Sequence, residues 1–197
     1  MNFRRLKSKQ KELTSEQDII AACIDNDQNA QSILFEKYAG KMLMICARYC
    51  LNIDDAKDAL HEGFIKVFRL LGKFKGNSTL ETWITRLMIN TSIDHFKKNV
   101  KFVHFDNDDD IHSLSDSDET YELELDEEEE IKMADLLKIV NELPDGYRIV
   151  FNLYAIEGYT HKEIANQLGI SEGTSKSQLA RARALLKKML KQQYNIG

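Results

Sequence analysis

The sequence is poor in the features that β-rich, secreted and membrane-spanning proteins require. Its 197 residues include one proline and nine glycines, which are too few for the frequent turns of a β-fold and leave helices as the expected structure. No apolar run approaches the roughly 20 residues that cross a bilayer. The N-terminus MNFRRLKSKQK is basic but lacks the apolar stretch of a signal peptide. We therefore expect an all-α, cytoplasmic protein without direct membrane insertion.

Cysteine and histidine are also too sparse for a metal or catalytic centre. The cysteines are Cys23, Cys46 and Cys50, and an odd number leaves at least one of them unpaired. No cluster of histidine and cysteine with metal-ligand spacing accompanies Cys46 and Cys50, and the five histidines form no catalytic spacing. We therefore expect buried thiols, with no metal, no cofactor, no small-molecule substrate and no enzymatic activity.

Charge is divided unevenly along the chain. The net charge is -5, yet residues 102–130 hold 14 acidic side chains and no lysine or arginine, so the rest of the chain carries +9. Two basic bodies joined by an acidic connector are typical of a nucleic-acid binder. We expect a basic tail over residues 1–14, a helical domain over 15–100, an acidic flexible linker over 101–130 and a second helical domain over 131–197. The tail either touches DNA phosphate or is disordered, and the linker either competes with nucleic acid or is only a spacer.

Apolar periodicity predicts the helices of both domains. In the first domain, apolar residues recur at helical spacing in four segments, and the loop GKFKGNS separates the third from the fourth. In the second domain, Leu143-Pro144 interrupts the pattern. The expected helices begin near Ser15, Gln28, Asp54 and Ser78 or Thr79, and then cover residues 131–141 and 144–156.

Residues 159–183, YTHKEIANQLGISEGTSKSQLARAR, have the pattern of a helix-turn-helix. Thr160 and Glu163 can form a capping box, so a helix is expected to begin directly after Thr160. Gly169 then permits a tight turn, and Ser171 can cap the second helix. The second helix is expected to turn one face inward, formed by Ser175, Leu179, Ala182 and Leu186.

The other side of this second helix carries small residues and cations. Gly173 and Ser177 would allow close approach to DNA, while Lys176, Arg181 and Arg183 supply the side chains that contact phosphates or guanine in the major groove. The alternative is that these cations form only a solvated face at a helix C-terminus. The candidate duplex-binding residues are Ser171, Gly173, Thr174, Lys176, Ser177, Arg181 and Arg183.

Both halves together resemble one protein family. Residues 54–98, DDAKDALHEGFIKVFRLLGKFKGNSTLETWITRLMINTSIDHFKK, closely resemble region 2 of the extracytoplasmic-function sigma factors, small two-domain members of the bacterial sigma factor family. Residues 143–183, which begin LPDGYRIVF, resemble their region 4. The resemblance implies that the chain binds core RNA polymerase, directs it to promoters, and has an anti-sigma factor as a common family partner. Region 4 would then read the -35 element as duplex.

The resemblance also assigns residues to the polymerase and to the -10 element. Acidic residues of the third helix match the family pattern that meets the largest polymerase subunit, and His61 stands where glutamine is usual. The residues so implied are Asp55, Asp58, His61 and Glu62. The loop and fourth helix resemble the part that engages single-stranded -10 DNA, for which backbone cations are needed. The residues so implied are Lys73, Lys75, Asn77, Arg86, Asn90, Lys97 and Lys98.

The sequence departs from the family pattern at several positions. Primary sigma factors carry a second aromatic residue where Ile84 stands, which predicts weaker melting. Family members often have an apolar residue at Ser175 and arginine at Gln178, so Gln178 would remove a cation from the recognition helix. Trp83 is either a stacking platform for a base or, as its inner position favours, a core residue.

Two other classes of function remain as alternatives. A one-component repressor or activator would need to dimerise to read two half-sites, and the sequence has no coiled-coil heptads or separate dimer domain. An enzyme acting on nucleic acid would need a nucleophile or metal constellation, for which the sequence gives no spacing. The sigma factor interpretation explains both halves of the chain.

Overall fold

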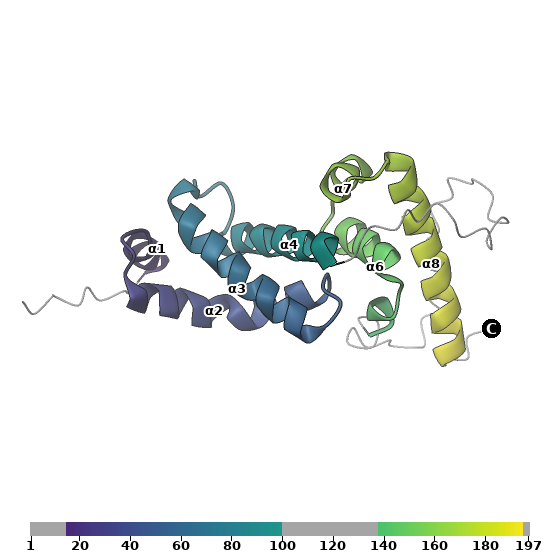
Figure 1. The fold of residues 1–197 in the computed structure, drawn as a ribbon, viewed down its shortest axis with the longest axis horizontal. Coiled ribbons are helices and arrows are strands. Elements are labelled where there is room, and N and C mark those ends of the chain that lie inside the picture. Colours follow the sequence, from purple (N-terminus) through teal and green to yellow (C-terminus); the bar gives the residue numbers. More distant parts are fainter. Residues whose placement is uncertain (1–14, 100–137, 195–197) are drawn as a thin grey trace, which may run out of the picture. The chain divides into compact units, whose positions relative to one another are not determined.

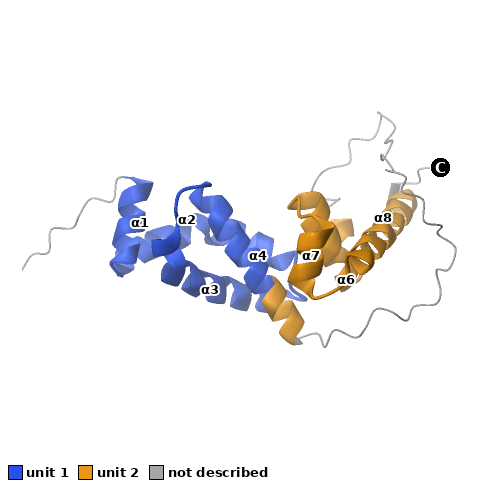
Figure 2. Cartoon of the chain, turned by 90° about the horizontal axis from the view of Figure 1, so that it is seen from above, with its two compact units in different colours: residues 1–92 blue, residues 93–197 orange. Residues whose placement is uncertain are grey.

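The computed structural model describes residues 15–99 and 138–194. Every regular element in these two ranges is helical, which confirms the predicted all-α class. The chain forms two compact units, residues 1–92 and 93–197, and the division falls inside one helix (Figure 2). The elements are α1 (Glu16–Ile24), α2 (Gln28–Ala47), α3 (Ile53–Leu70), η1 (Leu71–Lys73), α4 (Leu80–Asn99), α6 (Asp145–Phe151), η2 (Asn152–Ile156), α7 (His161–Leu168) and α8 (Glu172–Tyr194) (Figure 1).

Side-chain caps set where the helices of the first unit begin. Ser15 Oγ accepts the backbone N–H of Asp18 at 3.1 Å and completes a capping box at α1. Asp27 accepts two N–H groups at the start of α2, and Thr79 Oγ1 accepts that of Thr82 at 3.1 Å in the first turn of α4. Asn52 caps α3, so this helix begins at Ile53 and the cap was not among our sequence predictions. These local bonds satisfy N–H groups that a helix cannot satisfy itself.

Apolar side chains of α2, α3 and α4 form the core of the first unit. Leu34, Met42, Phe64, Ile84 and Met88 are each at most 2% exposed. Burying side chains of this size contributes roughly 1.5–3 kcal/mol each. The three cysteines also lie in this unit, buried and outside any disulfide, which confirms the expected thiols.

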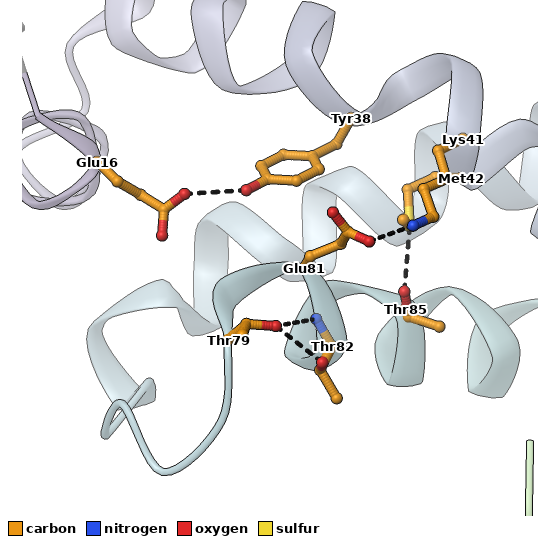
Figure 3. A network of polar contacts seen from close by, with 8 residues as sticks. All are labelled: Glu16, Tyr38, Lys41, Met42, Thr79, Glu81, Thr82 and Thr85. Atoms are coloured by element: carbon orange, nitrogen blue, oxygen red, sulfur yellow. Dashed lines mark hydrogen bonds and ion pairs between the residues drawn. The ribbon is translucent and has the colours of Figure 1, made fainter.

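Polar contacts around this core connect its helices (Figure 3). Glu16 of α1 accepts from Tyr38 Oη at 3.0 Å and from Lys37 Nζ at 2.8 Å, both on α2. Lys41 of α2 pairs with Glu81 of α4. Such partly exposed pairs stabilise weakly, by about 0–1 kcal/mol, so they orient the helices more than they hold them together.

The second unit is built around α8. One apolar cluster joins the turn of helix before α6 to the C-terminal half of α8, with Tyr147, Phe151, Leu185 and Met189 packed against it. Its buried members are Ile139, Val140, Leu143, Ala182, Leu186 and Leu190. The predicted helix over residues 144–156 is present as α6 followed by the π-helical η2. Residues 138–141 are helical, and the remainder of the predicted helix 131–141 lies outside the described residues.

Candidate nucleic-acid interface

The helix-turn-helix forms as its sequence predicts. Thr160 Oγ1 accepts the N–H of Glu163 at 3.3 Å, and the Glu163 carboxylate accepts the N–H of Thr160 at 2.8 Å. Gly169 ends α7 in the left-handed region, at φ 74°, where a Cβ would be strained. Ser171 Oγ then accepts the N–H of Thr174 at 2.9 Å in the first turn of α8. Local chemistry therefore fixes the angle at which α8 leaves the turn.

The two faces of α8 differ as expected. Ser175, Leu179, Ala182 and Leu186 are buried. The other side shows small residues flanked by cations, which suits close approach to a DNA groove. Of the seven predicted duplex-binding residues, Thr174 and Arg181 are half-buried, and the exposed ones are Ser171, Gly173, Lys176, Ser177 and Arg183.

Gln178 does not lie on this exposed face. Its side chain is 3% exposed, and its amide nitrogen Nε2 has no hydrogen-bond partner among the described residues. The expectation that Gln178 removes a cation from the DNA-facing surface is therefore wrong for this residue. Position 178 lies about 60° around the helix from Ser175, at the border of the two faces, and packing in the second unit turns its side chain inward.

Three side chains of the helix-turn-helix form a cluster with Tyr154 of η2, which was not predicted from the sequence. His161 Nδ1 lies 2.9 Å from Oγ of the fully buried Ser175. The His161 ring stacks on that of Tyr154, with centroids 4.6 Å apart and planes 21° from parallel. The guanidinium carbon of Arg183 lies 5.7 Å from the Tyr154 centroid. The signal in the sequence was Ser175, a polar residue on an apolar face.

Burial lowers the pKa of His161, and the positive charges of Lys176 and Arg183 lower it further, while Glu172 opposes them. The lowered pKa favours the neutral form of the ring in the folded chain. A neutral imidazole has one nitrogen that donates and one that accepts. Nδ1 can therefore either donate a hydrogen bond to the Ser175 hydroxyl or accept one from it. The neutral ring also avoids placing a third positive charge beside two cations of α8.

The second unit should lose stability at acidic pH because of His161. Its folded-state pKa is below the ordinary value of 6.5, so as pH falls the unfolded chain takes up a proton on this ring before the folded chain does. The contribution of the neutral ring is complete above pH 6.5 and is lost below it, as pH approaches the folded-state pKa. Denaturation of the full chain at about pH 7.5 and about pH 5.5, followed by circular dichroism, measures this loss. His161→Gln should show a smaller loss, and equal losses in both chains would contradict the assignment.

The loop before α4 exposes the cations expected at single-stranded DNA. Lys73 and Lys75 are exposed, and so is the neutral Asn77, which follows Gly76, whose φ is 72°. Phe74, between Lys73 and Lys75, packs on Trp83 with ring centroids 5.5 Å apart and 50° between planes. Trp83 is half-buried, so it is neither a free platform nor a fully enclosed core residue.

The predicted residues of α4 share one side of that helix for the most part. Asn90 and Lys97 follow Arg86 by four and eleven residues, spacings that return to nearly the same side of an α-helix. Arg86, Asn90 and Lys98 are exposed, and Lys97 is half-buried. Lys98 stands one residue beyond Lys97 and so points about 100° away. Arg86, Asn90 and Lys97 therefore form a track along one side of α4 that suits a phosphate backbone, and Lys98 lies off it.

The predicted acidic surface of α3 includes an exposed apolar side chain. Asp58 is exposed, Asp55 and Glu62 are half-buried, and Ile65 on the same side is 65% exposed. The spacing of the four residues places them within about 80° of one another. An apolar side chain among charges is typical of the centre and rim of a binding surface.

Two contacts hold groups of this surface in place. Lys66 Nζ lies 3.0 Å from Glu62 Oε1 and also donates to Thr91 Oγ1 of α4 at 3.2 Å. Lys66 therefore ties the Glu62 carboxylate to the neighbouring helix. His61 is exposed at the edge, with its ring parallel to that of Phe35 at 6.4 Å between centroids.

No group of three metal-ligating side chains occurs in residues 15–99 or 138–194. Burial raises the pKa of the Cys23 thiol to about 11, with a further contribution from Asp27, and burial likewise raises that of Cys46. Both thiols are held in their unreactive protonated form. Within the part of the chain that the structure describes, no helix is long and apolar enough to cross a membrane.

Both halves of the chain match known protein families. Residues 34–102 match the family model Sigma-70 region 2, and residues 133–186 match Sigma-70, region 4. The RNA polymerase sigma-H factor of Pseudomonas aeruginosa is 30% identical over 193 residues, which cover 90% of this chain and 96% of that protein. The ECF RNA polymerase sigma-E factor of Escherichia coli is 26% identical over 180 residues, covering 87% of this chain and 92% of that protein.

A solved structure of a sigma factor in complex with the anti-sigma factor NepR, from Bartonella quintana, is 21% identical, covers 81% of this chain and 96% of that one, and has a TM-score of 0.47. The family assignment rests on the sequence matches, which include both halves of the chain in the expected order. The chain belongs to the sigma-70 family of RNA polymerase sigma factors, in its extracytoplasmic-function group.

Proposed function

We propose that this sigma factor reads its promoter through two separate surfaces, one on α8 and the other on α4 and the loop before it. The cationic, small-residue face of α8 would bind the -35 element as duplex, and the loop before α4 with the polar side of α4 would bind the melted -10 element. The observation that carries the proposal is the capped helix-turn-helix with its exposed Lys176, Ser177 and Arg183. Small side chains permit close approach to base edges, while the cations pair with phosphate or guanine.

The proposed -35 contacts are divided by position on α8. Residues of its first turns lie at the end that enters the groove, and later cations reach the phosphates on either side. The proposed residues are Ser171, Gly173, Thr174, Lys176, Ser177, Arg181 and Arg183.

The proposed -10 contacts combine the cationic loop before α4 with the polar side of that helix. Single strands are bound through backbone charge and through pockets or aromatic platforms for unstacked bases. The Phe74–Trp83 pair borders the loop and gives it an apolar base. The proposed residues are Lys73, Lys75, Asn77, Arg86, Asn90, Lys97 and Lys98.

The proposed polymerase-binding surface is the α3 face with Ile65 exposed among the acidic residues. Complementary charge would guide the chain to a basic surface and fix its orientation. The residues are Asp55, Asp58, His61 and Glu62. An anti-sigma factor is proposed as a further partner, and the chain is proposed to act in the cytoplasm without enzymatic activity of its own.

The proposed domain boundaries are those of the sequence analysis. They are a tail over 1–14, a region 2 domain over 15–100, a linker over 101–130 and a region 4 domain over 131–197. Tail and linker lie outside the described residues.

Selection from a random promoter library tests the two-surface proposal. The chain, assembled with core polymerase, should select fragments with two separate sequence blocks. Lys176→Ala with Ser177→Ala should relax the upstream block, while Lys75→Ala with Asn77→Ala should weaken dependence on the downstream block. Glu142→Ala is the control, because Glu142 is exposed and is far in sequence from the residues of both surfaces. Equal effects of both double variants on both blocks would contradict the division of labour.

A further inference from the structure

Tyr154 contacts two functional parts of the helix-turn-helix at once. It lies in the π-helical η2 before the first helix, is half-buried, and stacks on His161 at the beginning of α7. Arg183 of α8 places its guanidinium over the same ring, 5.7 Å from the centroid. One aromatic ring thus contacts both helices of the motif.

The Arg183 side chain is otherwise directed to solvent. It is exposed on α8 and is one of the cations proposed to bind the -35 element. A free arginine side chain samples many rotamers and must lose that freedom when it binds phosphate. A ring that holds the guanidinium in one region reduces the number of conformations to be lost.

The Tyr154 ring is itself held in place by His161. His161 stacks on it and is fixed by the bond between Nδ1 and Ser175 Oγ at 2.9 Å. Ser175 is fully buried on the inner face of α8, so its hydroxyl cannot exchange this partner for bulk water. The chain of contacts runs from Ser175 on the inner face of α8 through His161 of α7 and Tyr154 of η2 to Arg183, an exposed residue at the side of α8.

We propose that Tyr154 is a positioning residue for promoter binding, which holds the Arg183 guanidinium ready for the DNA backbone, and that the His161–Ser175 pair fixes the Tyr154 ring for this purpose. The proposal rests on the proposed function of α8 as the -35 reader. It adds a residue outside α7 and α8 to the DNA-binding machinery. Tyr154 is expected to act through Arg183, without touching DNA.

A double-mutant cycle between Tyr154 and Arg183 tests this. The full chain, assembled with core polymerase, is titrated with a duplex that the wild-type holoenzyme has selected from a random library. We expect Arg183→Ala to weaken binding about tenfold and Tyr154→Leu about fourfold. The double variant should be weakened about tenfold, no more than Arg183→Ala alone, because Tyr154 has nothing left to position.

Three controls separate positioning from general loss of structure. Tyr154→Phe keeps the ring that stacks and attracts the cation, so it should bind within about twofold of wild type. Tyr147→Leu alters another half-buried tyrosine of this unit, one that packs in the apolar cluster, and its effect should multiply with that of Arg183→Ala. Thermal unfolding of each variant records any common loss of stability.

A measurement on the free chain tests the geometry without DNA. Side-chain proton shifts of Arg183 in NMR spectra should show a ring-current displacement in wild type and Tyr154→Phe, which disappears in Tyr154→Leu. The result that overturns the proposal is multiplicative loss in the Tyr154–Arg183 cycle, or no loss from Arg183→Ala in a chain whose wild type binds. Failure of the wild-type holoenzyme to select any duplex would instead overturn the proposed function, and the positioning role with it.

Discussion

Replacing Asp58 with lysine and Glu62 with glutamine should weaken binding of the chain to core RNA polymerase by about 100-fold. Both residues belong to the acidic surface of α3, where Ile65 is 65% exposed. Loss of one interfacial charge pair and reversal of another at roughly 1.5 kcal/mol each correspond to about two powers of ten in affinity. Binding of the fluorescently labelled chain to purified core polymerase, followed by anisotropy at fixed salt, measures the change.

Glutamine is chosen at position 62 so that the change does not also destabilise the fold. Lys66 pairs with Glu62 Oε1 at 3.0 Å, and a glutamine oxygen can still accept from it, whereas lysine would place two like charges one turn apart. The control is Asp25→Lys with Glu36→Gln, which makes the same change in net charge. Asp25 is exposed at the C-terminal end of α1, and Glu36 is exposed on α2. The account is contradicted if this control pair weakens polymerase binding as much as the α3 pair.

Gly63→Val should lower the free energy of unfolding of the first unit by about 3 kcal/mol. Gly63 is buried in α3, and a Cβ there would lie 2.3 Å from Sδ of Met88 on α4. Met88 is itself 0% exposed, so a branched side chain has no free volume to occupy and must move the two helices apart. Those helices carry the proposed polymerase surface and the proposed -10 track, so the spacing between α3 and α4 matters for both.

Urea denaturation followed by tryptophan fluorescence measures this loss, because Trp83 is the only tryptophan in the chain and lies in the first unit. Gly63→Ala should cost less than Gly63→Val, since the end of the methionine side chain can shift and alanine favours the helix by about 1 kcal/mol. Met88→Ala should partly restore the Gly63→Val chain. Gly40→Val is the matched control, because a Cβ at Gly40 meets nothing within 4 Å. Equal losses at Gly40 and Gly63 would refute the packing argument.

The features predicted correctly from sequence are those that depend on neighbours along the chain. The capping box of Thr160 and Glu163, the turn at Gly169 and the cap at Ser171 each involve residues within one helical turn. Their geometry is set by local hydrogen bonds and by backbone preference. The inner face of α8 was also predictable, since Leu179 and Ala182 follow the helical period.

The features that were missed depend on packing between elements. Gln178 lies at the border of two faces, and only the packing of the unit decides that its side chain turns inward. Trp83 is half-buried because Phe74, from the preceding loop, packs on its ring, and periodicity within α4 contains no information about that loop. His161 and Ser175 are 14 residues apart, so their bond appears only once the helix-turn-helix has been closed.

Run-off transcription tests the central claim most directly. Purified core polymerase is supplied with a fragment from upstream of the gene that encodes this chain, with and without the protein, because many family members drive their own expression. The account predicts transcripts that require the protein and start at one position, and that are lost with the Asp58 and Glu62 variant. Absence of transcripts on this fragment and on a random promoter library, together with no binding to core polymerase, would contradict the account.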